Sequence, residues 1–432
     1  MIAFLRHTIV GALAAAALAA LAACSSDGTP TSTTDGGASG LRVVVPPAPA
    51  PNMAGRGDLV SSSAGPRTPK LLVATTLALT GASRAFSARY DAQPYVVRYR
   101  TPNVEGQLVT ASGAVWFPVG ATGPLPLVTY MHGTETSKSE APSNLLGTAE
   151  GDVFGALYAS DGSVVAEPDY LGLGVAGAGQ YHPYLHVQSE ASAGVDLLRA
   201  ARTLAAQLGT PLDPGVFVTG YSQGGGAAMG LFRELERDYA TEFPVLGAAL
   251  GSGPYDLEST ARTMLEQNLD YHVTAVYTAY LVASFDTVYR IAPKLSDLIA
   301  PPNDKIAADL RDGVATSGEL AQLPSHARDV LRADVVQAML ADRDHPFWRA
   351  ARDNDTYDWT PRAPARMYYG GADKDVYPAN ALTAESKMRA NGARNVAAVN
   401  VGATLDHPGA VLPATIAGRL FLDSLRRGLV AR

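Results

Sequence analysis

A serine between two glycines is the residue of this sequence best suited to nucleophilic chemistry. Residues 220–224 read Gly-Tyr-Ser-Gln-Gly, a Gly-x-Ser-x-Gly pattern centred on Ser222. Residues 215–219 before it are apolar and β-branched, as in a buried strand, and residues 225–238 after it are rich in helix formers. A sharp turn from strand to helix exposes a serine hydroxyl, and small neighbours let the two backbones pass closely. We therefore predict a nucleophilic Ser222, although a glycine-rich loop before a helix would contain the same five residues.

A serine hydroxyl is a poor nucleophile unless a base takes its proton, and the usual base is a histidine oriented by a carboxylate. Asp373 directly follows a predicted strand, and His407 lies between the last predicted strand and the last predicted helix. Serine, acid and histidine follow one another in this order in α/β-hydrolases. We expect Asp373 and His407 to complete a triad with Ser222, and Asp375 is the alternative acid.

The negative charge that forms on a carbonyl oxygen during nucleophilic attack needs hydrogen-bond donors. The first expected donor is the backbone N–H of Gln223, because this residue follows the nucleophile and begins a helix. The second is expected in the loop after residues 125–131, which continues His-Gly-Thr. We assign the second donor to the backbone N–H of Thr134.

Two histidines with a spacing of four residues could suit a metal ion. These are His182 and His186. Pro183 disrupts a helix there, and no glutamate follows the first histidine as it does in helical metalloprotease motifs. We therefore expect no metal site and no cofactor.

The candidate residues follow segments that are typical of buried strands. Strands alternate with helices along most of the chain, which predicts an α/β fold with a mostly parallel sheet covered by helices on both faces. Such sheets bind ligands beyond the carboxyl ends of their strands, where the candidate residues should meet. An antiparallel pair is expected at residues 95–100 and 107–117. The other predicted strands are residues 125–131, 163–166, 215–219, 245–250, 365–369 and 396–401, and the predicted helices are residues 149–160, 189–208, 225–238, 379–390 and 408–426.

Residues 255–362 interrupt the alternation of strands and helices. They are expected to be helical, with apolar stripes and aromatic residues that more often form a core than a binding surface. An insertion between two sheet strands must pack at the end of the sheet where the site lies, so we expect a cap over the site. Its residues Tyr271, Tyr277 and Phe285 are expected to influence the size of substrate that the site accepts.

The first 69 residues are expected to serve export and tethering. Residues 1–23 combine a small positive region with an apolar stretch that is short for a membrane span, which is typical of a signal peptide. Cys24 is the only cysteine, and the preceding Leu-Ala-Ala resembles the lipobox of bacterial lipoproteins. We expect Cys24 to be lipidated and to anchor the protein in the cell envelope; an ordinary secretory signal is the alternative. Residues 24–69 are rich in Ser, Thr, Gly and Pro and predict a flexible tether, which leaves residues 70–254 and 363–432 for the two parts of the α/β core.

The composition is that of a globular protein with a large core. Of 432 residues, 47% are hydrophobic and 17% are charged. The formal charge of −7, without a long cluster of Lys and Arg, argues against a nucleic-acid partner. Contact with a membrane is expected only through the N-terminal anchor.

These motifs together resemble bacterial α/β-hydrolases related to the secretory lipases, from about residue 93 to the C-terminus. The matching stretches are residues 130–134, 168–174, 182–184 and 220–225, together with Asp373 and His407. The resemblance implies cleavage of carboxylic esters, often acyl esters or triglycerides, through an acyl-enzyme and beneath a helical cap. The expected partner is therefore a small-molecule or lipid ester.

The chain departs from this family pattern in two places. One residue, Tyr377, is added before Pro378, and Gly226 stands where relatives often carry a larger side chain. Three alternatives remain: a serine peptidase of the prolyl-oligopeptidase type, an esterase for feruloyl or tannin-type aromatic esters, and a non-catalytic envelope protein with the same fold.

Overall fold

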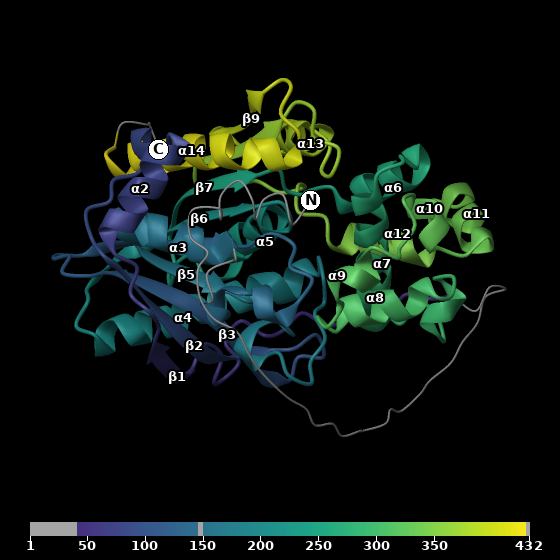
Figure 1. Ribbon diagram of the computed structural model, residues 1–432, viewed down its shortest axis with the longest axis horizontal. Coiled ribbons are helices and arrows are strands. Elements are labelled where there is room, and N and C mark those ends of the chain that lie inside the picture. The colour runs from purple at the N-terminus through teal and green to yellow at the C-terminus, as the bar shows by residue number, and fades with distance from the viewer. Residues whose placement is uncertain (1–40, 146–149, 429–432) are drawn as a thin grey trace.

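The computed structural model describes residues 41–145 and 150–428, so the predicted signal peptide and Cys24 lie outside the described residues. The described residues form a nine-stranded sheet in the order β1-β2-β3-β5-β4-β6-β7-β8-β9 (Figure 1). The pairs β1–β2, β2–β3 and β3–β5 are antiparallel, and all the other pairs are parallel. The strands are β1 (Leu59–Ala64), β2 (Ala92–Pro102), β3 (Leu108–Pro118), β4 (Leu125–Met131), β5 (Val164–Pro168), β6 (Leu212–Tyr221), β7 (Val245–Gly251), β8 (Ala365–Gly370) and β9 (Val396–Gly402).

Side chains of the central strands are buried on both faces of the sheet. In β6, Val216 and Val218 belong to one apolar cluster and Phe217 to another, because successive side chains of a strand point to opposite faces. The first cluster includes side chains of α4, α5 and α13, and the second includes side chains of α2, α3 and α14. The prediction of a mostly parallel α/β sheet covered on both faces is confirmed. These helices are α2 (Lys70–Thr80), α3 (Glu150–Ser160), α4 (Val187–Gln207), α5 (Gln223–Asp238), α13 (Ala379–Ala390) and α14 (His407–Arg426).

The insertion expected at residues 255–362 is helical and has a core of its own. Its helices gather at one side of the sheet and are drawn in green in Figure 1. Phe285 is fully buried in this core, with ring centroids 5.3 Å from Tyr289 and 5.9 Å from Phe347. The helices are α6 (Leu257–Gln267), α7 (His272–Tyr289), α8 (Asn303–Arg311), α9 (Ser317–Leu320), α10 (Ala327–Val330), α11 (Ala333–Ala341) and α12 (Pro346–Asp353).

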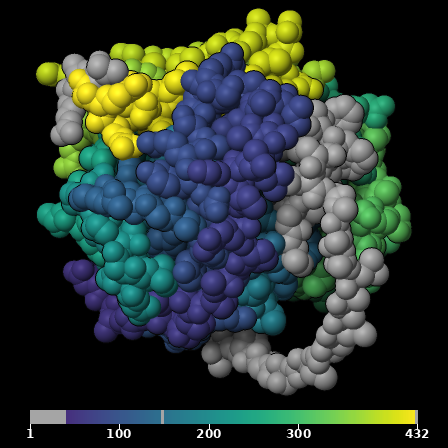
Figure 2. Space-filling view, turned by 60° about the vertical axis from the view of Figure 1, so that its left-hand side comes forward, coloured from purple at the N-terminus to yellow at the C-terminus, as the bar shows by residue number. Residues whose placement is uncertain are grey.

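The prediction of a flexible tether over residues 24–69 is wrong for residues 41–69, which pack on the fold. β1 pairs with β2 through its backbone, so its run of serines needs no apolar face. Arg56 is buried, and its Nε lies 3.0 Å from Oδ2 of the buried Asp196 in α4. Figure 2 shows the N-terminal part of the described chain, in purple and blue, lying against the body of the molecule beside the yellow C-terminal part.

None of the helices in the described ranges, 41–145 and 150–428, is long and apolar enough to span a membrane.

Replacing Arg56 with alanine is expected to lower the free energy of unfolding by about 3 kcal/mol, because the Asp196 carboxylate stays buried and loses a charged partner. Denaturant unfolding followed by circular dichroism measures this change. Arg67→Ala is the matched control, since Arg67 is exposed, and should change the free energy by less than about 0.5 kcal/mol. Equal stability of the two variants would contradict the packed position of residues 41–69.

Candidate active site

Ser222 lies at the sharp turn between β6 and α5. Its backbone has φ 60° and ψ −127°, and this positive φ is strained for a residue with a side chain. Gly220 and Gly224 on either side have no room for a Cβ, because it would clash with the backbone of Gly224 and of Met131 respectively. The strand and the helix pass as closely as the sequence predicts, and this contact maintains the turn.

The structure brings Ser222, His407 and Asp373 together at the carboxyl edge of the sheet. Oγ of Ser222 lies 2.8 Å from Nε2 of His407, and Nδ1 of His407 lies 2.7 Å from Oδ2 of Asp373. Asp373 follows β8, and His407 is the first residue of α14 after β9. This arrangement allows the carboxylate to orient the imidazole and the imidazole to take the serine proton.

The loop after β8 holds the Asp373 carboxylate in this orientation. Oδ1 accepts hydrogen bonds from the backbone N–H groups of Asp375 and Val376, at 3.0 and 2.9 Å. The other carboxylate oxygen therefore faces the imidazole.

His407 has a pKa that lies above the ordinary value of 6.5. Burial alone would lower this pKa, but the charge of Asp373 and its hydrogen bond raise it, with smaller contributions from Asp375 and Glu150. The imidazolium form is therefore stabilised, as a general base in a triad requires.

Asp375, the alternative acid, does not contact the His407 ring through a hydrogen bond. It is only 1% exposed, and its carboxylate accepts hydrogen bonds from the hydroxyls of Tyr271 and Tyr277, at 2.7 and 3.1 Å. Asp375 thus joins the acid loop to the helical insertion. Sequence analysis missed this contact, because its partners lie about a hundred residues away in the chain.

The two expected oxyanion donors lie on neighbouring elements. Gln223 is the first residue of α5, where helix N–H groups have no partner within the helix, and Thr134 follows β4.

Glu150 lies beside the loop that carries Thr134. The Gly133 N–H donates to Oε1 of Glu150 at 3.2 Å, and Tyr130 also donates to Glu150. Burial raises the pKa of Glu150 to about 6, although these hydrogen bonds oppose the increase.

A narrow apolar cavity extends from Ser222 into the helical insertion. The space between atoms, with the open solvent at its mouth included, is about 650 Å³. Tyr277 contributes to its wall, whereas Phe285, expected to do the same, lies in the core of the insertion. The other apolar side chains of the wall include Leu257, Ala261, Met264, Leu265, Leu281, Val282, Met339, Phe347 and Trp348.

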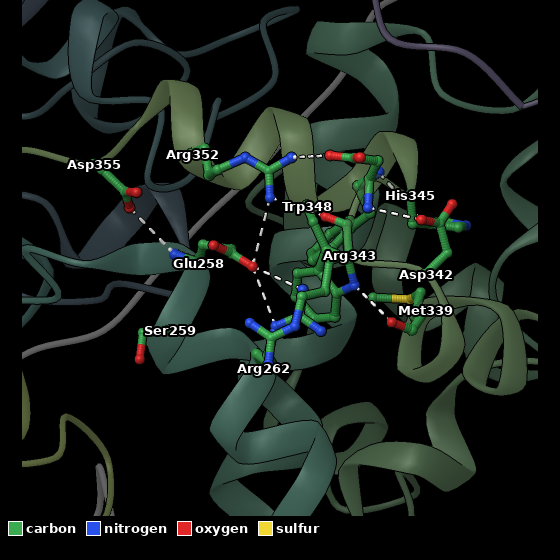
Figure 3. Close-up of polar contacts among 12 residues, drawn as sticks. Glu258, Ser259, Arg262, Met339, Asp342, Arg343, His345, Trp348, Arg352 and Asp355 are labelled. Atoms are coloured by element: carbon green, nitrogen blue, oxygen red, sulfur yellow. Dashed lines mark hydrogen bonds and ion pairs between the residues drawn. The ribbon is translucent and has the colours of Figure 1, made fainter.

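A polar cluster behind this wall holds the Trp348 ring in place (Figure 3). The indole Nε1 donates to the backbone oxygen of Met339 at 2.7 Å. The guanidinium of Arg262 lies 4.4 Å from the ring centroid and donates to Glu258 at 2.7 Å. The wall of the cavity is therefore fixed by directional contacts as well as by packing.

His182 and His186, the two histidines with metal-like spacing, are both buried. Nδ1 of His182 contacts the backbone oxygen of Leu171 at 2.9 Å, and its Nε2 contacts the side chain of Gln223 at 3.1 Å. His186 lies with its ring 5.9 Å from that of Tyr289. The two rings have different neighbours, and His182 belongs to the surroundings of the serine.

Comparison with known proteins agrees with this architecture. A protein from Legionella pneumophila, lpg1103, is 27% identical and superimposes with a TM-score of 0.80, over 87% of this chain and 100% of the other. The rice cell wall degrading esterase LipA from Xanthomonas oryzae is 28% identical with a TM-score of 0.76, over 86% and 98%. Lipase A from Candida antarctica, at 17% identity and a TM-score of 0.66 over 88% and 84%, shares the fold. No functionally curated protein matches the sequence.

A family model gives the identification. The secretory lipase model matches residues 149–404, which is more than half of the chain. These residues include the turn at Ser222, the helical insertion and Asp373. The chain belongs to the secretory lipase family of carboxylic ester hydrolases and has the α/β-hydrolase fold.

Proposed function

We propose that this protein is an exported serine esterase or lipase in which Ser222, His407 and Asp373 form the catalytic triad. The observation that carries the proposal is the pair of contacts of 2.8 and 2.7 Å that joins the three side chains. Ser222 also lines the apolar cavity, so a bound acyl group would lie beside the nucleophile.

The proposed reaction has two steps. His407 takes the Ser222 proton while Oγ attacks the ester carbonyl, and the N–H groups of Gln223 and Thr134 stabilise the oxyanion by about 3 kcal/mol per donor. The carbon–oxygen bond to the alcohol then breaks, and His407 gives the proton to the leaving oxygen. In the second step His407 takes a proton from water, which attacks the acyl-enzyme and releases the acid and Ser222.

The substrate proposed is a neutral ester with an apolar acyl chain. The cavity wall is mostly aliphatic and aromatic, and such a wall gains free energy by removing an acyl chain from water. The helical insertion supplies most of this wall, which supports its proposed role as a cap. A charged peptide would lose its hydration in the same cavity without comparable polar partners.

Export and membrane attachment are proposed from the N-terminal sequence and from membership of a secretory family. Cys24 would carry the lipid anchor. Cells that express the protein and are labelled with a radioactive fatty acid should show label on the wild type and none on Cys24→Ser. An unlabelled wild-type protein would contradict the anchor but not the esterase.

Ser222→Ala should lower kcat on p-nitrophenyl esters on the order of a million-fold while leaving the fold intact, because the nucleophilic oxygen is lost. Activity is measured on acyl chains of increasing length, on a feruloyl ester and on an aminoacyl nitroanilide. The proposal expects the highest kcat/KM on acyl esters. More than about a hundredth of wild-type activity in the variant would place the nucleophile elsewhere, and preference for the anilide would indicate a peptidase.

The acid side of the pH profile should report His407. Protonated His407 cannot take the serine proton, so activity is present above its pKa and is lost as the pH falls through a midpoint above 6.5. Asp373→Asn should lower kcat on the high-pH plateau roughly ten-thousand-fold. It should also move this midpoint to lower pH, because the carboxylate charge that raises the His407 pKa is removed. Asp375→Asn should move the midpoint in the same direction with a much smaller loss, and the opposite ranking would assign the acid to Asp375.

Ala261→Phe should reduce kcat/KM for long acyl chains relative to acetate, because the added ring fills part of the cavity beside α6. A decrease of about ten-fold in the long-to-short ratio corresponds to the loss of roughly two buried methylene groups. Phe285→Leu is the control, since this residue packs in the insertion core. It should lower stability without changing the ratio. An unchanged ratio in Ala261→Phe would remove the basis for the acyl site.

A further inference from the structure

The segment of residues 181–186 connects the candidate active site to the helical insertion. It precedes α4, and its residues His182 and Tyr184 are buried. Each of these two side chains contacts a residue that the proposed function assigns to the oxyanion site.

His182 holds the side chain of Gln223. The backbone oxygen of Leu171 can only accept a hydrogen bond, so Nδ1 of His182 donates to it, and Nε2 is left to accept from Nε2 of Gln223 at 3.1 Å. Oε1 of Glu190 accepts from the same Gln223 nitrogen at 2.7 Å. Burial lowers the pKa of His182 to about 3, which keeps this acceptor unprotonated at neutral pH. The first residue of α5 is therefore fixed by its side chain as well as by its backbone.

Tyr184 holds the loop of the second donor. Its hydroxyl shares a hydrogen bond of 2.9 Å with Oγ1 of Thr134. Its ring stacks on that of Tyr280 in α7, with centroids 4.1 Å apart and planes at 5°. The Tyr280 hydroxyl donates to the backbone oxygen of Glu135 at 3.3 Å. The loop after β4 is thus held by Tyr184 and by α7 together.

The backbone of His182 is itself bound to the insertion. Its N–H donates to the backbone oxygen of Arg311 in α8 at 2.7 Å, and its carbonyl accepts from the hydroxyl of Ser284 in α7 at 3.1 Å. These two hydrogen bonds join the segment of residues 181–186 to two helices of the insertion. A displacement of these helices would therefore move His182 and Tyr184 with them.

We propose that His182 and Tyr184 are positioning residues that hold Gln223 and Thr134 in the geometry needed to bind the oxyanion, and that the insertion supports them. The proposal rests on the proposed function, which places the oxyanion between these two backbone N–H groups. Donors stabilise a transition state most when they are already oriented, and a small displacement costs rate without costing substrate binding.

The test uses the full chain, with variants that remove single contacts. Tyr184→Phe removes the hydroxyl and keeps the stacked ring, and Thr134→Val removes the same hydrogen bond from its other end. His182→Phe removes the acceptor for Gln223. Tyr181→Phe is the control, because the Tyr181 hydroxyl has no hydrogen-bond partner among the described residues.

Each variant is measured with p-nitrophenyl acetate, with a trifluoromethyl ketone that forms an oxyanion on Ser222, and with the matching methyl ketone. Tyr184→Phe, Thr134→Val and His182→Phe should each lower kcat about ten-fold and lower the affinity for the trifluoromethyl ketone by the same factor. The KM and the affinity for the methyl ketone should stay within about two-fold of the wild type, and Tyr181→Phe should match the wild type in all four quantities.

Double variants separate the two contacts. Tyr184→Phe with Thr134→Val should lose about ten-fold in total, because both remove one hydrogen bond. Tyr184→Phe with His182→Phe should lose about a hundred-fold, because they act on separate donors. If Tyr184→Phe or Thr134→Val does not fold, the other variant of that contact still gives the answer.

Two results would overturn the proposal. Wild-type kcat and trifluoromethyl ketone affinity in Tyr184→Phe and Thr134→Val would show that the contact does not position the donor. An equal loss of affinity for both ketones would show that the residue contacts the substrate instead. An inactive wild-type protein, or an active Ser222→Ala variant, would reject the proposed function itself. Both are measured before these variants are compared, so the two failures can be distinguished.

Discussion

The close approach of three backbones at Gly220 and Gly224 is the constraint on which the site depends. β4, β6 and α5 meet there with no room for a Cβ on either glycine. The chain must therefore turn sharply at Ser222, with a positive φ that costs about 1–3 kcal/mol for a residue with a side chain. The surrounding sheet maintains this strain, and the serine hydroxyl is held above the carboxyl edge as a result.

The parallel sheet brings the remaining groups to the same edge. Asp373 follows β8 and His407 follows β9, and together with Ser222 they meet within hydrogen-bond distance although they lie far apart in sequence. Thr134 follows β4 at the same edge. This convergence could be predicted from the sequence, because each residue follows a recognisable apolar strand and the carboxyl ends of parallel strands share one edge. The fold class and the antiparallel pair β2–β3 were predictable for the same reason, since both depend on local patterns.

Contacts between distant segments could not be predicted in this way. β1 contains a run of serines typical of a linker, and it is stabilised by backbone pairing. Asp375 lies in a segment whose composition is typical of a solvated turn, but it is buried against Tyr271 and Tyr277. Phe285 and Tyr277 belong to the same aromatic stripe, yet only Tyr277 lines the cavity. In each case the outcome depends on which distant segment packs against the residue, and local periodicity contains no such information.

The central claim is that Ser222 is the residue that becomes acylated, and a covalent adduct tests it most directly. The full chain is treated with a fluorophosphonate ester, digested and analysed by mass spectrometry. The comparison is labelling at acid pH, where His407 is protonated. The proposed triad predicts one adduct per chain, on the peptide that contains Ser222, and slower labelling at acid pH. An adduct on another residue, or an unlabelled Ser222 in protein that cleaves esters, would contradict the claim.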